Sequence, residues 1–376
     1  MDTVFKFDPE ILIGSDTLSM AGTIASRHGS RIMLAADHNL DAHSVNRLKD
    51  ILEDSGLETI VFDGIEEESS VEMAENIVEL SCAAHCDAII GFGGSKTQII
   101  SRMAAIMAPL RITSFELLDG RNCQNKFLPL LAIPTEGMSV FSLTKYFIMT
   151  DPRTRMIKCA VSPENLYTAV IVDTSLFKFL TLNNAAAFVL EGFLYAAEAY
   201  CSSKANFFSD TILERSLNYY AKLLRSPPSP GFSGELFAQA NFLCAIGSCA
   251  SSPGIGAAIS AAVNARSPAA RPLCSAALLP QIAERLASAR PEKMARIASY
   301  LSNVKAASTA EAAASAAENI RKTMTALNVP QDLKSYNISL DRMTAAAEAA
   351  RNLDFTANSP WSAAEEEIFK ILKEII

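Results

Sequence analysis

Short apolar runs alternate with segments of helical periodicity over the first half of the chain, and this alternation constrains the fold most. Apolar runs bounded by turn residues are typical of buried parallel strands, and apolar residues at helical spacing indicate amphipathic helices between them. We expect strands at 31–36, 57–62, 87–92, 127–133 and 169–172, and helices at 16–28, 44–55 and 71–84. Strands and helices in this order predict an α/β fold with a parallel sheet covered on both faces.

The character of the chain changes near residue 175. Beyond it, strand signals end and alanine-rich segments with helical periodicity continue to the C-terminus. A chain of 376 residues also exceeds what one hydrophobic core usually supports. We therefore expect an α/β domain at 1–175 and an all-helical domain at 176–376. A β-hairpin is expected at 146–150 and 156–161, around the turn-forming tetrapeptide Asp151-Pro-Arg-Thr154.

Charge and cysteine content limit the partners and the compartment. A formal net charge of −8 argues against nucleic acid and anionic membranes as partners, because both require a basic face. No apolar run reaches the roughly 18 residues of a membrane span, and the acidic N-terminal segment has no signal-peptide core. Eight irregularly spaced cysteines favour reduced thiols in a cytoplasmic protein. Cys82, His85 and Cys86 lack a second pair of ligands, so we interpret them as ordinary helix residues.

A glycine-rich segment, Ile89-Ile-Gly-Phe-Gly-Gly-Ser95, leads from the third expected strand into a helix beginning near Lys96. Glycines let a backbone approach an anion, and the free amides of a helix N-terminus can hold a phosphate. The sequence therefore predicts a phosphate-binding loop at Gly93, Gly94 and Ser95. The structural alternative is a Ser-x-x-Gln capping box formed by Ser95 and Gln98, which requires no ligand.

Further motifs follow in order within residues 10–285: Ile133-Pro-Thr135 with Thr144, Ala169-Val-Ile-Val-Asp173, Glu198-Ala-Tyr200, Ala205-Asn206 with Ser209-Asp210, and Leu278-Leu-Pro280. Together with the glycine-rich loop they resemble segments of the iron-type (group III) alcohol dehydrogenases, relatives of dehydroquinate synthase. The resemblance implies a Rossmann-like α/β domain with a parallel sheet, followed by an all-α domain. Residues after 285 match only as generic helices.

The same resemblance implies an NAD site and a homodimer formed through the N-terminal domain. Asp37 matches the family's acidic residue on the adenosine ribose, where an acid favours NAD over NADP; its alternative is a strand-end turn residue. Lys158 matches a lysine near the cofactor phosphates, or is an exposed hairpin lysine. The implied cofactor-binding residues are Asp37, Gly93, Gly94, Ser95, Thr135, Thr144 and Lys158. The chain departs from the family where it has Glu136, Met138, Val140 and Phe141 in place of small or hydroxylated residues. Of these, Met138, Val140 and Phe141 should narrow or fill the space on the nicotinamide side.

No histidine follows His85, although the family's metal site uses three histidines and one aspartate in the C-terminal half. The resemblance places Glu191 and Tyr195 at the first two ligand positions and Arg271 at the last. The remaining position falls on Val263 or on Ala261, depending on the motif used to align it. Alanine and valine have no ligand atom, and an arginine cannot be deprotonated to coordinate. We therefore expect no metal bound in the family manner.

Arg271 has two interpretations. As a functional group, its guanidinium could polarise a carbonyl or anchor a carboxylate, with Tyr195 as proton donor. As a structural group, it could form a buried ion pair with Glu191 that fills the former metal cavity; we favour this interpretation. Three functions remain open: a degenerate family member that binds a nucleotide or small ligand, a metal-independent NAD-linked reductase, and a conventional metal-dependent dehydrogenase.

Overall fold

The computed structural model describes residues 7–65, 70–121, 123, 126–136, 138, 140–163, 165–179, 182–225, 233–302, 308–362 and 364–376. The chain forms two compact units. The first consists of Met1–Met138, Lys145–Pro152 and Cys159–Phe179, and the second of Ser139–Thr144, Arg153–Lys158 and Leu180–Ile376. The main division follows Phe179, near the expected boundary at residue 175, while two short segments before it group with the helical unit.

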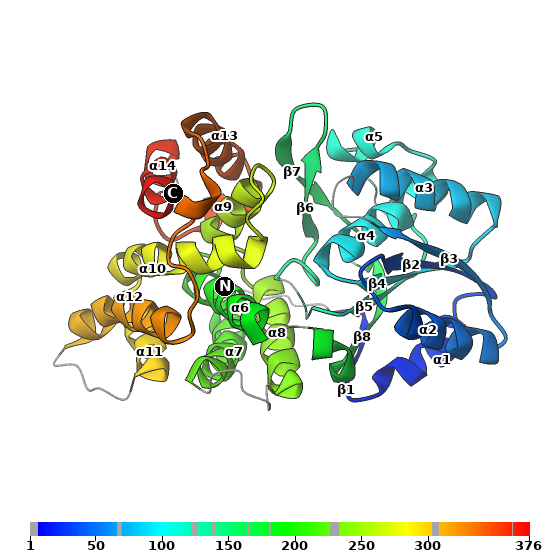
Figure 1. The fold of residues 1–376 in the computed structure, drawn as a ribbon, viewed down its shortest axis with the longest axis horizontal. Coiled ribbons are helices and arrows are strands. Elements are labelled where there is room, and N and C mark those ends of the chain that lie inside the picture. Colours follow the sequence, from blue (N-terminus) through cyan, green and yellow to red (C-terminus); the bar gives the residue numbers. More distant parts are fainter. Residues whose placement is uncertain are drawn as a thin grey trace. The chain divides into compact units, whose positions relative to one another are not determined.

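The first unit is built on a parallel six-stranded sheet with the order β1-β8-β5-β4-β2-β3 (Figure 1). Its strands are β1 (Glu10–Gly14), β2 (Arg31–Asp37), β3 (Glu58–Ile65), β4 (Ala88–Gly93), β5 (Leu130–Pro134) and β8 (Tyr167–Asp173). The predicted parallel sheet is confirmed. The prediction omitted β1, a short edge strand whose side chains are half-buried or exposed and whose apolar run is limited to Ile11-Leu-Ile13.

Helices cover both faces of this sheet, with α1 (Ala21–Ala25) and α2 (Ala42–Asp54) on one side and α3 (Ser70–Ala83) and α4 (Ser95–Leu110) on the other (Figure 1). A short helix, α5 (Ser114–Leu118), follows α4. The helix expected at 16–28 is shorter than predicted: a 3₁₀ turn at Thr17–Met20 precedes α1. Gly22 within α1 and Gly29 after it have weak helix propensity, which agrees with the early end.

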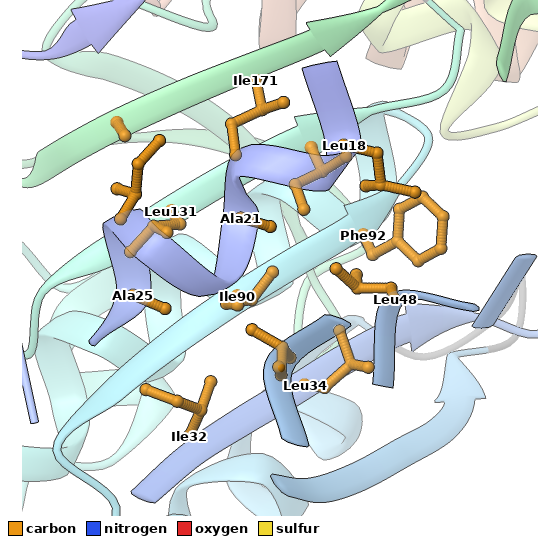
Figure 2. Close-up of a cluster of buried hydrophobic side chains, with 14 of the residues drawn as sticks. Leu18, Ala21, Ala25, Ile32, Leu34, Leu48, Ile90, Phe92, Leu131 and Ile171 are labelled. Carbon is orange, nitrogen blue, oxygen red and sulfur yellow. The ribbon is translucent and has the colours of Figure 1, made fainter. Parts of the chain in front are cut away.

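A continuous apolar core lies between the sheet and the face covered by α1 and α2 (Figure 2). Alternate side chains of the central strands point into it, as the two-residue period of a strand requires. Each fully buried leucine, isoleucine or phenylalanine contributes about 1.5–3 kcal/mol relative to an exposed one. The fully buried members include Leu18, Ala21, Ala25, Ile32, Leu34, Leu48, Ile90, Phe92, Leu131 and Ile171.

The order of the strands reverses between β2 and β4. The chain leaves β2 toward β3 through α2, returns to the other side of β2 as β4 through α3, and continues to β5 through α4. In open α/β sheets, ligands bind beyond the carboxyl ends of the strands at such a reversal. The residues at those ends are Asp37 on β2 and Gly93 on β4.

The second unit is helical. The predicted hairpin is present as the two-stranded sheet β6-β7, of which β6 belongs to the first unit and β7 is divided between the two. The hairpin strands are β6 (Tyr146–Asp151) and β7 (Met156–Val161). No helix in the described part of the chain is long and apolar enough to cross a membrane. The helices of the unit are α6 (Leu182–Cys201), α7 (Phe207–Arg225), α8 (Gly234–Cys249), α9 (Ile255–Asn264), α10 (Arg271–Ala289), α11 (Pro291–Leu301), α12 (Thr309–Ala326), α13 (Leu340–Arg351) and α14 (Glu365–Ile375).

Candidate functional site

The glycine-rich loop ends β4 and begins α4. Gly93 has φ +153°, and a Cβ added there would lie 2.6 Å from the Asp37 Cβ and 2.7 Å from the Thr97 Oγ1. Both the backbone angle and the lack of space therefore require glycine at this position. Gly94 is the N-cap of α4 and provides no side-chain cap, so the first turn presents backbone amides.

The predicted capping box of Ser95 and Gln98 is wrong. Gly94, not Ser95, occupies the N-cap position, and the Gln98 side chain faces the preceding strand. Its Nε2 donates to the carbonyl oxygens of Gly91 at 2.9 Å and Gly93 at 3.2 Å. These two contacts hold the loop against its own helix, which the local pattern Ser-x-x-Gln could not indicate.

Asp37 lies beside this loop, at the end of β2. Its Oδ1 accepts from the Asn39 amide at 3.0 Å, and its Oδ2 accepts from the Thr97 hydroxyl at 3.3 Å. The side chain is 20% exposed, so it is neither closed off nor fully solvated. The turn-residue role and a ribose-binding role are therefore both compatible with its position.

The carboxylate of Glu136 lies directly over the loop. A Cβ added at Gly94 would meet Glu136 Oε2 at 2.6 Å, Cδ at 2.7 Å and Oε1 at 3.0 Å. The Ser95 amide donates to Glu136 Oε2 at 3.4 Å. The sequence identified Glu136 only as a departure from the family pattern, and it gave no signal that this side chain returns to the first turn of α4.

The other expected cofactor residues are divided between the two units. Thr135 is buried in the first unit, and its amide donates to the Gly93 carbonyl at 3.2 Å. Thr144 and Lys158 belong to the second unit; the Thr144 hydroxyl donates to the Phe141 carbonyl at 3.4 Å, and Lys158 is half-buried on β7. The structure thus brings together Asp37, Gly93, Gly94, Ser95 and Thr135.

The second group of expected site residues forms a closed polar cluster, which we call the Glu191 cluster: Glu191, Tyr195, Ser260, Arg271 and Ser275. Arg271, the first residue of α10, forms a two-pronged ion pair with Glu191 on α6. Its Nε donates to Glu191 Oε1 at 2.8 Å and its Nη2 to Oε2 at 3.1 Å. The expected pair is therefore present, with side chains only 19% and 7% exposed.

Two more donors complete the shell of the Glu191 carboxylate. The Tyr195 and Ser275 hydroxyls donate to Oε1 at 3.0 Å and 3.1 Å. With the two bonds from Arg271, the carboxylate accepts three hydrogen bonds at Oε1 and one at Oε2. Burial, and secondly the charge of Glu191, raise the pKa of the Tyr195 phenol far above its usual value.

Sequence reasoning missed both serines of this cluster. Ser260 on α9 lies 3.2 Å from the Tyr195 hydroxyl, and Ser275 on α10 lies 3.3 Å from it. Ser275 follows Arg271 by four residues and so shares its helix face, which is a signal that could have identified it. Ser260 lies one turn before Val263 on α9, and Val263 is buried.

An aromatic side chain from the segment that follows Thr135 packs against the Glu191 cluster. The Phe141 ring lies 6.4 Å from the Tyr195 ring in an edge-on arrangement and 5.6 Å from the Phe355 ring. Met138 and Val140, the other bulky replacements in this segment, are buried. Among the described residues, no three His, Cys, Asp or Glu side chains are grouped closely enough to hold a metal ion.

A second buried carboxylate on α6, Glu198, caps the start of α9. Its two oxygens accept from the amides of Gly256 at 2.5 Å and Ala257 at 3.1 Å. Burial raises the pKa of Glu198 to about 7, although the two amides act in the opposite direction. The Glu-Ala-Tyr motif therefore supplies a helix cap that joins α6 to α9.

Comparison with known proteins gives matches over nearly the whole chain. The family model "Iron-containing alcohol dehydrogenase" matches residues 8–174, and the model of the family's C-terminal region matches residues 185–376. The second match extends past Leu278-Leu-Pro280, the last motif recognised in the sequence, to the final residue. The 1,3-propanediol dehydrogenase of Citrobacter freundii is 24% identical over 353 residues, which cover 92% of this chain and 91% of that protein.

Solved structures match the fold equally broadly. A crystal structure of 1,3-propanediol oxidoreductase has a TM-score of 0.92 at 22% identity, with 100% of both chains covered. The sulfoacetaldehyde reductase from Bifidobacterium kashiwanohense, solved in complex with NAD+, has a TM-score of 0.83 at 17% identity and covers 100% of this chain and 99% of its own. At these identities the structural matches establish the fold.

Proposed function

Because the chain belongs to the iron-containing alcohol dehydrogenase family, we propose that it binds an adenine nucleotide without metal-dependent alcohol oxidation. The ion pair between Arg271 and Glu191 carries this proposal. It lies where the resemblance places two of the family's metal ligands. The side chains present there do not fit a divalent metal, since an arginine cannot coordinate one.

The hydrogen bonds around Glu191 support the same conclusion. Its carboxylate already accepts from Arg271, Tyr195 and Ser275, and a metal ion beside it would meet the positive charge of the Arg271 guanidinium. The raised pKa of Tyr195 also makes this phenol a poor proton donor, which speaks against a metal-independent reductase that relies on it. Both observations favour a structural role for the cluster.

Nucleotide binding rests on the loop at the reversal of strand order. The amides at Gly94 and Ser95 would hold the pyrophosphate, and Asp37 would accept from the ribose hydroxyls. NAD, when bound, would supply a hydride acceptor.

Following the family resemblance, we further propose a homodimer formed through the N-terminal domain, which light scattering on purified protein would test.

The first test is the metal content of the protein. We expect no stoichiometric iron or zinc in protein purified without chelator, because the Glu191 cluster offers one carboxylate, already paired with Arg271, and no histidine. Elemental analysis measures this, and a chelator should leave the melting temperature unchanged. Near-equimolar metal, or a metal-stimulated oxidation of small primary alcohols, would contradict the proposal.

The second test concerns the nicotinamide side. We expect ADP-ribose to bind at least as tightly as NAD, because Met138, Val140 and Phe141 fill space where the family has small residues. Isothermal titration calorimetry compares the two ligands on the same protein. NAD binding tighter by about tenfold, equal to about 1.4 kcal/mol, would mean that the nicotinamide pocket is intact.

A further inference from the structure

We propose that Glu136 is an internal occupant of the phosphate loop: its carboxylate holds the place of a nucleotide phosphate and sets how tightly phosphate-bearing ligands bind. This inference rests on the proposed nucleotide-binding function and adds the residue that limits it. It concerns a position at which the chain departs from its family and for which the resemblance implies no role in cofactor binding.

The geometry of approach is that of an anion on the loop. Both carboxylate oxygens and Cδ of Glu136 lie within 2.6–3.0 Å of the position that a Gly94 Cβ would take. The absence of a side chain at Gly94 is therefore used by Glu136 itself. The Ser95 amide, the first of α4, donates to Glu136 Oε2 at 3.4 Å. Backbone amides at a helix N-terminus attract negative charge, whether it comes from a phosphate or from a carboxylate.

The backbone keeps Glu136 at this place. β4 and β5 pair in parallel up to Gly93 and Pro134, and the Thr135 amide then donates to the Gly93 carbonyl at 3.2 Å. Glu136 is the next residue, so its backbone lies beside the loop, and its side-chain conformation brings the carboxylate to Gly94. A side chain so tethered competes at a high effective concentration with any ligand from solution.

Competition follows from charge and from space. A phosphate that approaches Gly94 must displace the Glu136 carboxylate, and it meets a like charge if that carboxylate stays nearby. A ligand without phosphate makes neither demand. Removing Glu136 should therefore strengthen the binding of ADP-ribose but not that of adenosine.

The experiment measures the dissociation constants of ADP-ribose and adenosine for the full-length protein and for Glu136→Thr and Glu136→Gln. We expect Glu136→Thr to tighten ADP-ribose by at least about tenfold, or about 1.4 kcal/mol. Glu136→Gln removes the charge but keeps the volume, and should tighten ADP-ribose by about threefold or more. Adenosine should change by less than about twofold. Glu79→Gln, a substitution at an exposed residue of α3, makes the same change in net charge and should have no effect.

The outcomes separate this inference from the proposed function. Unchanged or weaker ADP-ribose binding by Glu136→Thr overturns the inference alone if the wild-type protein binds, as does equal tightening of adenosine. If only the variants bind ADP-ribose, the inference stands and nucleotide binding by the wild type fails. If no protein binds it, both fail. Should Glu136→Thr not fold, the Glu136→Gln result decides by the same criteria.

Discussion

Replacing Arg271 by methionine is expected to lower the free energy of unfolding by about 3–5 kcal/mol, because it leaves the Glu191 carboxylate buried without its countercharge. The pair is two-pronged, and the Glu191 side chain is only 7% exposed. The hydroxyls of Tyr195 and Ser275 remain as donors, but they carry no charge. Chemical denaturation with a helical-signal readout measures the loss.

Two further variants sharpen this test. Adding Glu191→Gln to Arg271→Met removes the stranded charge and should recover part of the stability. Arg321→Met breaks an exposed pair with Glu284, whose side chains are 32% and 48% exposed. Such surface pairs are worth about 0–1 kcal/mol, so this control should change little. Unchanged stability for Arg271→Met would contradict the structural role and favour an anion-binding role for Arg271.

The difference in the free energy of unfolding between the wild-type protein and Glu198→Gln should change with pH. The pKa of Glu198 is about 7 in the folded protein, against an ordinary value of 4.5 expected in the unfolded chain. The folded state therefore holds the proton more tightly, so stability is highest below the unfolded pKa and falls as pH rises through the folded one. Because glutamine does not ionise, the variant should gain about 3 kcal/mol relative to wild type between about pH 4.5 and pH 8.

The test depends only on how this difference changes with pH. Glutamine offers one acceptor oxygen to the two amides of Gly256 and Ala257, and the stability lost in this way is the same at every pH. Denaturant unfolding of both proteins across the pH range measures it. The exposed Glu348 on α13 provides a control: Glu348→Gln should keep a constant difference from wild type. A constant difference for Glu198→Gln as well would mean that Glu198 stays ionised in the fold.

The central strands could be predicted because burial on both faces leaves a continuous apolar run in the sequence, as in β2 and β4. The edge strand β1 was not predicted, because its apolar run, Ile11-Leu-Ile13, is only three residues long and its side chains are half-buried or exposed. The hairpin was recognised from its turn residues. What a sequence pattern records is therefore the degree of burial more than the strand itself.

The candidate site was predictable where charge or the family pattern marked a residue. Arg271 and Glu191 stand out in apolar helices, and the resemblance brought them together before their contact was seen. Ser260 could not be distinguished from other small residues in alanine-rich helices, whereas the four-residue spacing from Arg271 was an unused signal for Ser275. The predicted Ser95 capping box was wrong for a different reason. The Gln98 side chain donates to carbonyl oxygens of the preceding strand, and the local sequence does not indicate these partners.

The shared carboxylate of Glu191 also has a consequence for protein engineering. The donors around it share one acceptor, so the effects of substitutions in the cluster depend on one another. Arg271→His alone would lose the two-pronged pair without completing a metal site, because position 195 holds a tyrosine and positions 261 and 263 hold an alanine and a valine. Building a metal site here would therefore need several substitutions at once, because a single change in the cluster removes a stabilising contact before it adds a working ligand set.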